Sequence, residues 1–224
     1  MDSRVDLSGP AQPPASGGAP QQIVVFFHGV GADGNDLIAL APFFAQALPD
    51  ALFLAPDGPE PCDMAPFGRQ WFSLLDRSTA RLVQEVRRAR SVIDGFLDGL
   101  LETHGLGDDK LALIGFSQGT MAALHVALRR PRPVAAMVGF SGALLESDEM
   151  AGEITARPPT LLVHGTHDEV VPAQALPLAE AGLQALGVEV QTMIRPGLGH
   201  GIDPEGAQLA RQFLAQHLGV TPGT

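Results

Sequence analysis

Residues 111–119 read Leu-Ala-Leu-Ile-Gly-Phe-Ser-Gln-Gly, and the fold can be worked out from this stretch. Leu111 to Ile114 form an apolar run typical of a buried strand, and a helical pattern follows from Met121 to Arg130. A G-x-S-x-G sequence between a strand and a helix predicts a nucleophile elbow, a turn so tight that its serine is strained. The two glycines leave room for the neighbouring strand and helix. Ser117 is therefore the candidate nucleophile.

Strand and helix patterns alternate along the rest of the chain. Buried strands are predicted at 23–27, 51–54, 111–114, 134–140 and 160–163, and an alternating pattern at 188–194 predicts a strand nearer the sheet edge. Helices are predicted at 37–48, 79–102, 121–130 and 173–186, and a last one opens at Asp203 and Pro204. Because parallel strands need crossovers, we expect an α/β fold whose mostly parallel central sheet is covered by helices on both faces.

The chain is expected to form one catalytic domain over residues 23–224, after an irregular arm or short edge strand over residues 1–22. Pro42 lies inside the predicted helix 37–48 and should kink it. Long connections span 55–77 and 141–159, and neither is large enough for a separate lid domain.

Composition excludes several classes of function. The net charge of −11 repels nucleic acid and anionic membrane surfaces. No apolar run reaches the roughly 18 residues of a membrane span, and the N-terminus lacks a secretory pattern. The single cysteine, Cys62, agrees with a reducing cytoplasm, where we expect the protein. The arginines within 81–90 are interpreted as a solvated helix face rather than an anion-binding patch.

A serine nucleophile needs a base and an acid that orients the base. His200 lies in a glycine-rich loop after the last strand, whereas His125 lies on the body of the helix after Ser117. Asp168 follows the strand 160–163, and its neighbour Glu169 is the rival acid. Since functional groups gather at the carboxyl ends of parallel strands, Ser117, Asp168 and His200 are the predicted catalytic residues, in the chain order of α/β-hydrolases.

Three other interpretations of nearby residues stay open. His164, His167 and Asp168 could instead be metal ligands, although no further ligand cluster is near and we expect no metal. His28 could be a base, but a role in supporting its loop is favoured. Ser141 also follows a strand, yet it lacks the second glycine of an elbow, so we interpret it as pocket wall or a structural turn.

Acyl transfer produces an oxyanion, which needs amide donors already aimed at it. The backbone N–H of Gln118, the residue after the serine, is one expected donor. The other should come from the loop after the first central strand, where Val30 is best placed.

Several motifs together carry a family resemblance. They are Phe27-His28-Gly29-Val30-Gly31-Ala32-Asp33-Gly34-Asn35-Asp36-Leu37, Trp71-Phe72, Gly115 to Gly119, His164 to Pro172 and Gly199-His200-Gly201. In this order, over about residues 23–202, they resemble the phospholipase/carboxylesterase family of small α/β-hydrolases. The resemblance implies a triad of Ser117, Asp168 and His200, an oxyanion hole at Val30 and Gln118, and no cofactor. Ser73 departs from the pattern, because many relatives carry an acid after the Trp-aromatic pair.

The apolar residues of the 55–77 connection are candidates for an acyl site. Met64, Phe67, Trp71 and Phe72 could line it, with Trp71 the leading contact, or they could cover the core under a long loop.

The expected activity is that of a serine carboxylesterase on short- to medium-chain esters, which are its small-molecule partners. The alternatives are an acyl-protein or acyl-carrier thioesterase, a lysophospholipase, and a non-catalytic binding protein of the same fold. A homodimer is left open, whereas nucleic acid and an integral membrane location are excluded.

Overall fold

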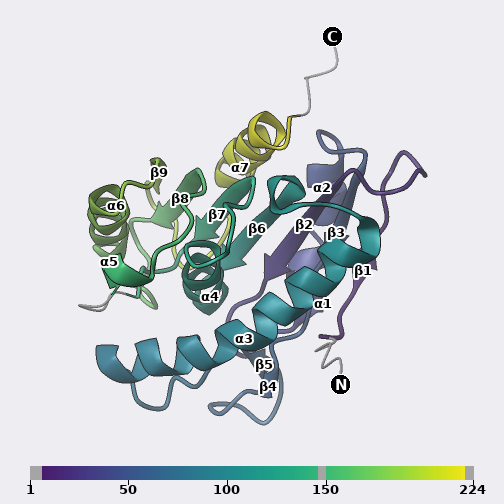
Figure 1. The fold of residues 1–224 in the computed structure, drawn as a ribbon. Coiled ribbons are helices and arrows are strands. Elements are labelled where there is room, and N and C mark those ends of the chain that lie inside the picture. The colour runs from purple at the N-terminus through teal and green to yellow at the C-terminus, as the bar shows by residue number, and fades with distance from the viewer. Residues whose placement is uncertain (1–6, 146–149, 220–224) are drawn as a thin grey trace.

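The computed structural model describes residues 7–145 and 150–219. Within them a seven-stranded sheet has the order β1-β3-β2-β6-β7-β8-β9 (Figure 1). The strands are β1 (Ala11–Gln12), β2 (Gln22–Phe27), β3 (Ala51–Leu54), β6 (Leu111–Phe116), β7 (Ala136–Phe140), β8 (Thr160–Gly165) and β9 (Val190–Arg195). All neighbouring pairs are parallel except β1 with β3. The sheet is therefore mostly parallel, as predicted, and β9 is an edge strand.

Helices cover both faces of this sheet. They are α1 (Gly34–Ile38), α2 (Ala41–Ala45), α3 (Thr79–His104), α4 (Gln118–Ala127), α5 (Met150–Glu153), α6 (Ala175–Ala185) and α7 (Pro204–His217). Alternate residues of β2 point to opposite faces: Val25 packs in a core with α3, α4 and α6, and Phe26 packs in a second core with α1, α2 and α7. The predicted three-layer α/β fold is confirmed (Figure 1).

The predicted single helix over 37–48 is wrong. Two short helices, α1 and α2, take its place, and Pro42 lies in the first turn of α2. Proline has no N–H and clashes with the preceding turn, so it opens a new helix more readily than it continues an old one.

The long 55–77 connection contains a small hairpin of β4 (Glu60–Pro61) and β5 (Arg69–Gln70). Among the residues that the structure describes, no helix is both long and apolar enough to cross a bilayer. The arginines of α3 lie in ion pairs, for example Arg81 with Glu85 and Arg90 with Asp94.

His125 on α4 is buried where α4 packs against α3, and neither ring nitrogen has a hydrogen-bond partner among the described residues. Burial lowers the pKa of His125 to about 3, and the positive charges of Arg129, Arg90 and Arg87 act in the same direction. The unfolded chain, with an ordinary histidine pKa, binds this proton more readily than the folded protein does. Stability from neutral His125 is therefore complete above about pH 6.5 and is lost as the pH falls.

The substitution His125→Leu should weaken this acid sensitivity. Each pKa unit corresponds to about 1.4 kcal/mol, so between pH 7 and pH 4 the free energy of unfolding should fall by about 3 kcal/mol less in the variant than in the wild type. Urea unfolding at both pH values measures the difference. An equal loss of stability in the two proteins would show that His125 binds a proton in the folded state.

Candidate active site

Ser117 lies between the last residue of β6 and the first residue of α4. Its backbone has φ 55° and ψ −118°, a strained conformation that a non-glycine residue adopts only when its surroundings enforce it. The turn is packed against its neighbours on both sides. A Cβ on Gly115 would lie 2.5 Å from the Thr120 Cα, and one on Gly119 would lie 1.9 Å from the Phe27 carbonyl oxygen. Both positions therefore require glycine, as the elbow pattern predicted.

The loop after β2 passes beside this serine. A Cβ on Gly29 would lie 3.6 Å from the Ser117 Cβ and 3.2 Å from the Phe116 ring. Val30 follows Gly29 in this loop, and Gln118 is the first residue of α4, whose backbone N–H has no carbonyl partner within its own helix. The segments of the two expected oxyanion donors are thus neighbours.

Asp168 and His200 are in contact, although 32 residues separate them. The Asp168 Oδ2 lies 2.8 Å from the His200 Nδ1, and the Asp168 Oδ1 accepts the backbone N–H groups of Val170 and Val171 at 2.9 and 2.8 Å. Burial raises the pKa of the Asp168 carboxyl, but the hydrogen bonds from His200 and these two amides outweigh it and hold the pKa below its usual value. The carboxylate is therefore ionised at neutral pH and acts only as an acceptor.

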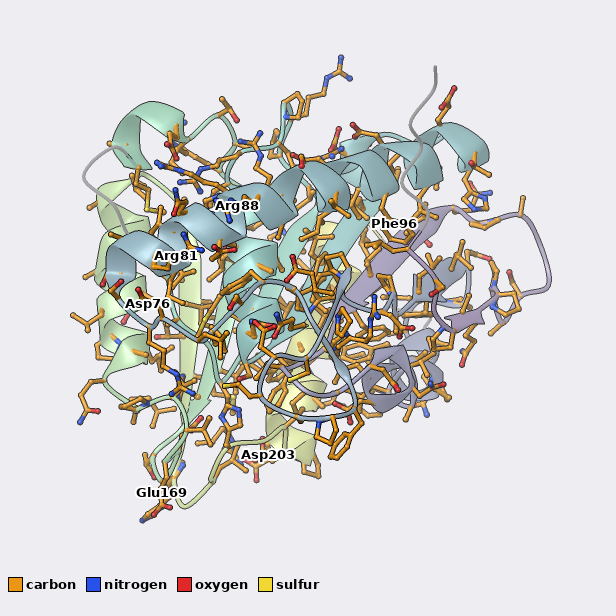
Figure 2. The ribbon with its side chains drawn as sticks, turned by 90° about the horizontal axis from the view of Figure 1, so that it is seen from below. Asp76, Arg81, Arg88, Phe96, Glu169 and Asp203 are labelled. Carbon is orange, nitrogen blue, oxygen red and sulfur yellow. The ribbon has the colours of Figure 1, made fainter. Side chains whose placement is uncertain are left out.

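The imidazole of His200 packs on Phe116, with ring centroids 4.8 Å apart. Phe116 directly precedes Ser117, so the histidine lies against the residue before the candidate nucleophile, at the carboxyl end of the sheet. The rival acid Glu169 is exposed, and Figure 2 labels it at the lower edge of the molecule. The geometry therefore brings Asp168, and not Glu169, to this histidine.

His28 supports its loop through both ring nitrogens. Its Nε2 accepts the Gly58 N–H at 2.9 Å, and its Nδ1–H donates to the Gly29 carbonyl at 2.7 Å. This pattern defines a neutral tautomer, and burial lowers the pKa of His28 despite the Gly29 carbonyl and nearby carboxylates. Because both ring nitrogens are engaged in these hydrogen bonds, His28 is not positioned to act as a base.

Trp71 supports the same loop, and a substrate contact for this residue stays a prediction. Its ring is buried against Phe27, with centroids 4.6 Å apart, and its Nε1–H donates to the His28 carbonyl at 2.9 Å. Phe72 is also in the core, whereas Met64 and Phe67 are exposed. Burying an aromatic ring against the sheet removes a large apolar surface from water and so stabilises the fold, which explains why Trp71 and Phe72 are buried.

The side chain of Gln118 has a structural role that the sequence analysis did not predict. Its side-chain oxygen accepts the Trp71 backbone N–H at 3.0 Å, and its side-chain amide donates to the Phe72 carbonyl at 2.6 Å. The side chain thus ties α4 to the 55–77 connection. A buried amide directly after the serine was the available signal, because such a group must find partners.

Ser141, the second serine at a strand end, forms a turn against the elbow. Its φ is 48°, and its backbone N–H donates to the Val163 carbonyl at 2.9 Å. A Cβ on Gly142 would lie 3.0 Å from the Ser117 carbonyl oxygen and 2.4 Å from the Thr120 Cβ. This close packing agrees with the structural-turn interpretation.

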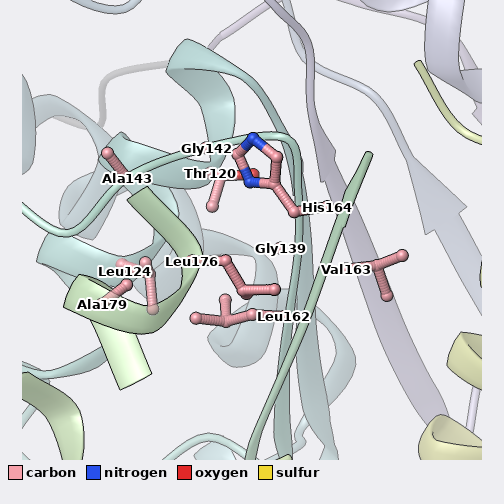
Figure 3. A pocket seen from close by; sticks show the side chains of 10 residues that line it. All are labelled: Thr120, Leu124, Gly139, Gly142, Ala143, Leu162, Val163, His164, Leu176 and Ala179. Carbon is pink, nitrogen blue, oxygen red and sulfur yellow. The ribbon is translucent and has the colours of Figure 1, made fainter. Parts of the chain in front are cut away.

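A narrow pocket lies beneath this turn, between α4, α6 and the neighbouring strands (Figure 3). Its lining is almost entirely apolar, with the His164 imidazole at one end, and it does not include the four residues proposed from the 55–77 connection. The residues around it are Thr120, Leu124, Gly139, Gly142, Ala143, Leu162, Val163, His164, Leu176 and Ala179. Within the described ranges, no three histidine, cysteine or acidic side chains gather as metal ligands.

Comparisons with known proteins agree with this architecture. A family model described as Phospholipase/Carboxylesterase matches residues 14–218. The chain is 32% identical to esterase YpfH of Escherichia coli K12 over 87% of this chain and 82% of that protein. It is 25% identical to acyl-protein thioesterase 1 of Gibberella zeae over 87% of this chain and 90% of that protein. The crystal structure of esterase PE8 superposes with a TM-score of 0.90 at 41% identity, covering 96% of this chain and 100% of that one.

Proposed function

The chain belongs to the phospholipase/carboxylesterase family, and from that membership we propose that it is a serine carboxylesterase acting on short- to medium-chain carboxylic esters. The contact of Asp168 with His200, at the sheet end that carries the strained Ser117, is the observation that supports this most strongly. The family is one of carboxylic ester hydrolases, and its relatives include esterases. The single cysteine fits a reducing compartment, so the proposal locates the enzyme in the cytoplasm.

In this mechanism the His200 Nε2 takes the Ser117 hydroxyl proton while the oxygen attacks the ester carbonyl. Asp168 keeps the other ring nitrogen protonated and stabilises the imidazolium that forms. The oxyanion accepts the backbone N–H groups of Gln118 and Val30, and α4 adds the positive end of its dipole. His200 then protonates the leaving alcohol. In the second half of the reaction His200 takes a proton from water, whose oxygen attacks the acyl-enzyme carbonyl. The carboxylic acid leaves when His200 returns the proton to Ser117.

Acyl-chain selectivity should be broad and should favour shorter chains. Each buried methylene contributes only about 0.8 kcal/mol, so an apolar site separates neighbouring chain lengths weakly. Among the described residues no separate lid domain lies between β7 and β8, which favours short- and medium-chain esters in solution over emulsified lipid.

A fluorophosphonate probe and a p-nitrophenyl ester series from acetate to palmitate test the proposal together. We expect the probe to label Ser117, as mapped by mass spectrometry, and the highest kcat/KM for acyl chains of about two to eight carbons. Absence of labelling would favour a non-catalytic binding protein. A preference for palmitate would favour a lysophospholipase or acyl-protein substrates.

Oxygen esters and thioesters of equal chain length separate the esterase from the thioesterase alternative. The two enzyme alternatives would use the same triad, and their substrates differ in the leaving group, which is an alcohol for the ester and a thiol for the thioester. A kcat/KM that is more than about tenfold higher for the thioester, beyond its greater intrinsic reactivity, would overturn the choice of carboxylesterase.

A further inference from the structure

A second histidine contacts the carboxylate of Asp168. His164 lies near the end of β8 and is buried. Its Nε2 lies 2.9 Å from the Val171 carbonyl oxygen and 3.3 Å from the Asp168 Oδ2. Both of these oxygens can only accept a hydrogen bond, since the carboxylate is ionised. The Nε2 of His164 must therefore carry the proton: its N–H donates to the Val171 carbonyl and lies beside the Asp168 Oδ2 without a hydrogen bond to it.

His164 thus lies beside a carboxylate that hydrogen bonds from other groups hold in place. The two amides of Val170 and Val171 fill Oδ1, while His200 and His164 both approach Oδ2. The Val171 peptide takes part twice, because its N–H binds Asp168 and its carbonyl binds His164. The loop that carries the acid is therefore tied directly to β8.

We infer that His164 is a positioning residue for catalysis, which fixes the Val171 peptide and through it the orientation of the Asp168 carboxylate toward His200. This inference rests on the triad proposed above. Without the His164 N–H the Val171 carbonyl loses this hydrogen bond, and the peptide can turn. The Asp168 carboxylate, which the Val171 N–H holds, would then be less well aligned with His200.

The surroundings of His164 make this interaction specific. Asp168 lies on the loop after β8, and His200 lies beyond that carboxylate, on the loop after β9. Among the described residues, the helices packed against this part of the sheet contribute four residues to the pocket below the ring, none of them ionisable: Thr120 and Leu124 from α4, and Leu176 and Ala179 from α6 (Figure 3).

The variants His164→Gln and His164→Met test the inference, because glutamine and methionine have similar length and shape but only glutamine carries a donor near the position of the Nε2. We expect His164→Met to lower kcat about tenfold, in keeping with loss of a buried hydrogen bond. KM should stay within about threefold of the wild-type value, because the orientation of the acid and the base matters most in the transition state. His164→Gln should restore most of kcat.

Three comparisons decide the outcome. Equal kcat values in the Gln and Met variants would overturn the inference and leave His164 a structural residue, whatever its effect on the melting temperature. His125→Leu is the matched control, because it replaces another buried histidine, and its kcat should stay within about threefold of the wild-type value. In the unmodified protein, nitrogen NMR should find the Nε2–H tautomer at His164; an Nδ1–H tautomer would also overturn the inference. If Ser117→Ala keeps full activity, the proposed triad itself is wrong, which is a distinct result.

Discussion

The substitution Ser117→Ala should lower kcat/KM for p-nitrophenyl esters by about 10⁴-fold or more and abolish labelling by a fluorophosphonate. The change removes one oxygen atom, and in the proposed mechanism that oxygen forms the acyl-enzyme bond. The oxyanion donors belong to the backbone of Val30 and Gln118, so they remain and leave only a small residual rate. The packing of the elbow depends on Gly115 and Gly119, and the variant should therefore fold normally.

Ser141→Ala is the matched control for this prediction. Ser141 also follows a strand of the sheet, and among the described residues its hydroxyl makes only a long contact of 3.5 Å, to the Gly201 carbonyl. Because such a contact is near the limit of a hydrogen bond, the control should keep its activity within about threefold and should still be labelled. Initial rates at saturating and subsaturating ester give kcat and KM for both variants. A Ser117→Ala protein with wild-type activity would contradict the assignment of the nucleophile.

The substitution Asp168→Asn should have a similarly large effect, of about 10⁴-fold in kcat/KM. The amides of Val170 and Val171 donate to one oxygen of this side chain, so an asparagine must place its carbonyl oxygen there. Its NH₂ group is then directed at the His200 Nδ1, where a donor meets a donor. His200 must change tautomer and protonate Nε2, which removes the lone pair that would accept the serine proton.

The adjacent carboxylate supplies the control for this effect. Glu169→Gln removes the same charge from an exposed side chain one residue away, and kcat/KM should change by less than about threefold, since exposed charges act weakly at this distance. Steady-state rates between pH 5 and pH 9 should give a low, flat profile for Asp168→Asn. Equal activities of the two variants would remove Asp168 from the mechanism.

Much of the fold follows from local sequence patterns. Continuous apolar runs predicted the central strands, the alternating run predicted that β9 lies at the edge, and helical spacing predicted the crossovers. The predicted helix over 37–48 was the main error. The apolar spacing continues across Pro42, but a proline cannot lie inside a continuous helix, so the backbone forms two helices there. The choice of Asp168 over Glu169 came from strand-end position, and the structure agrees with it through one contact, while the catalytic roles stay predictions.

The sequence alone determined the α/β class, the strained turn at Ser117 and the strand ends that carry Asp168 and His200. These features depend on residues close together in the chain, whose spacing and size limit the backbone directly. The tertiary structure alone decided that Trp71 supports the His28 loop, that the Gln118 side chain holds the 55–77 connection, and that His164 holds the Val171 peptide beside Asp168. Each of these depends on where a buried polar group finds its partner, and that is set by the packing of the whole sheet and its connections.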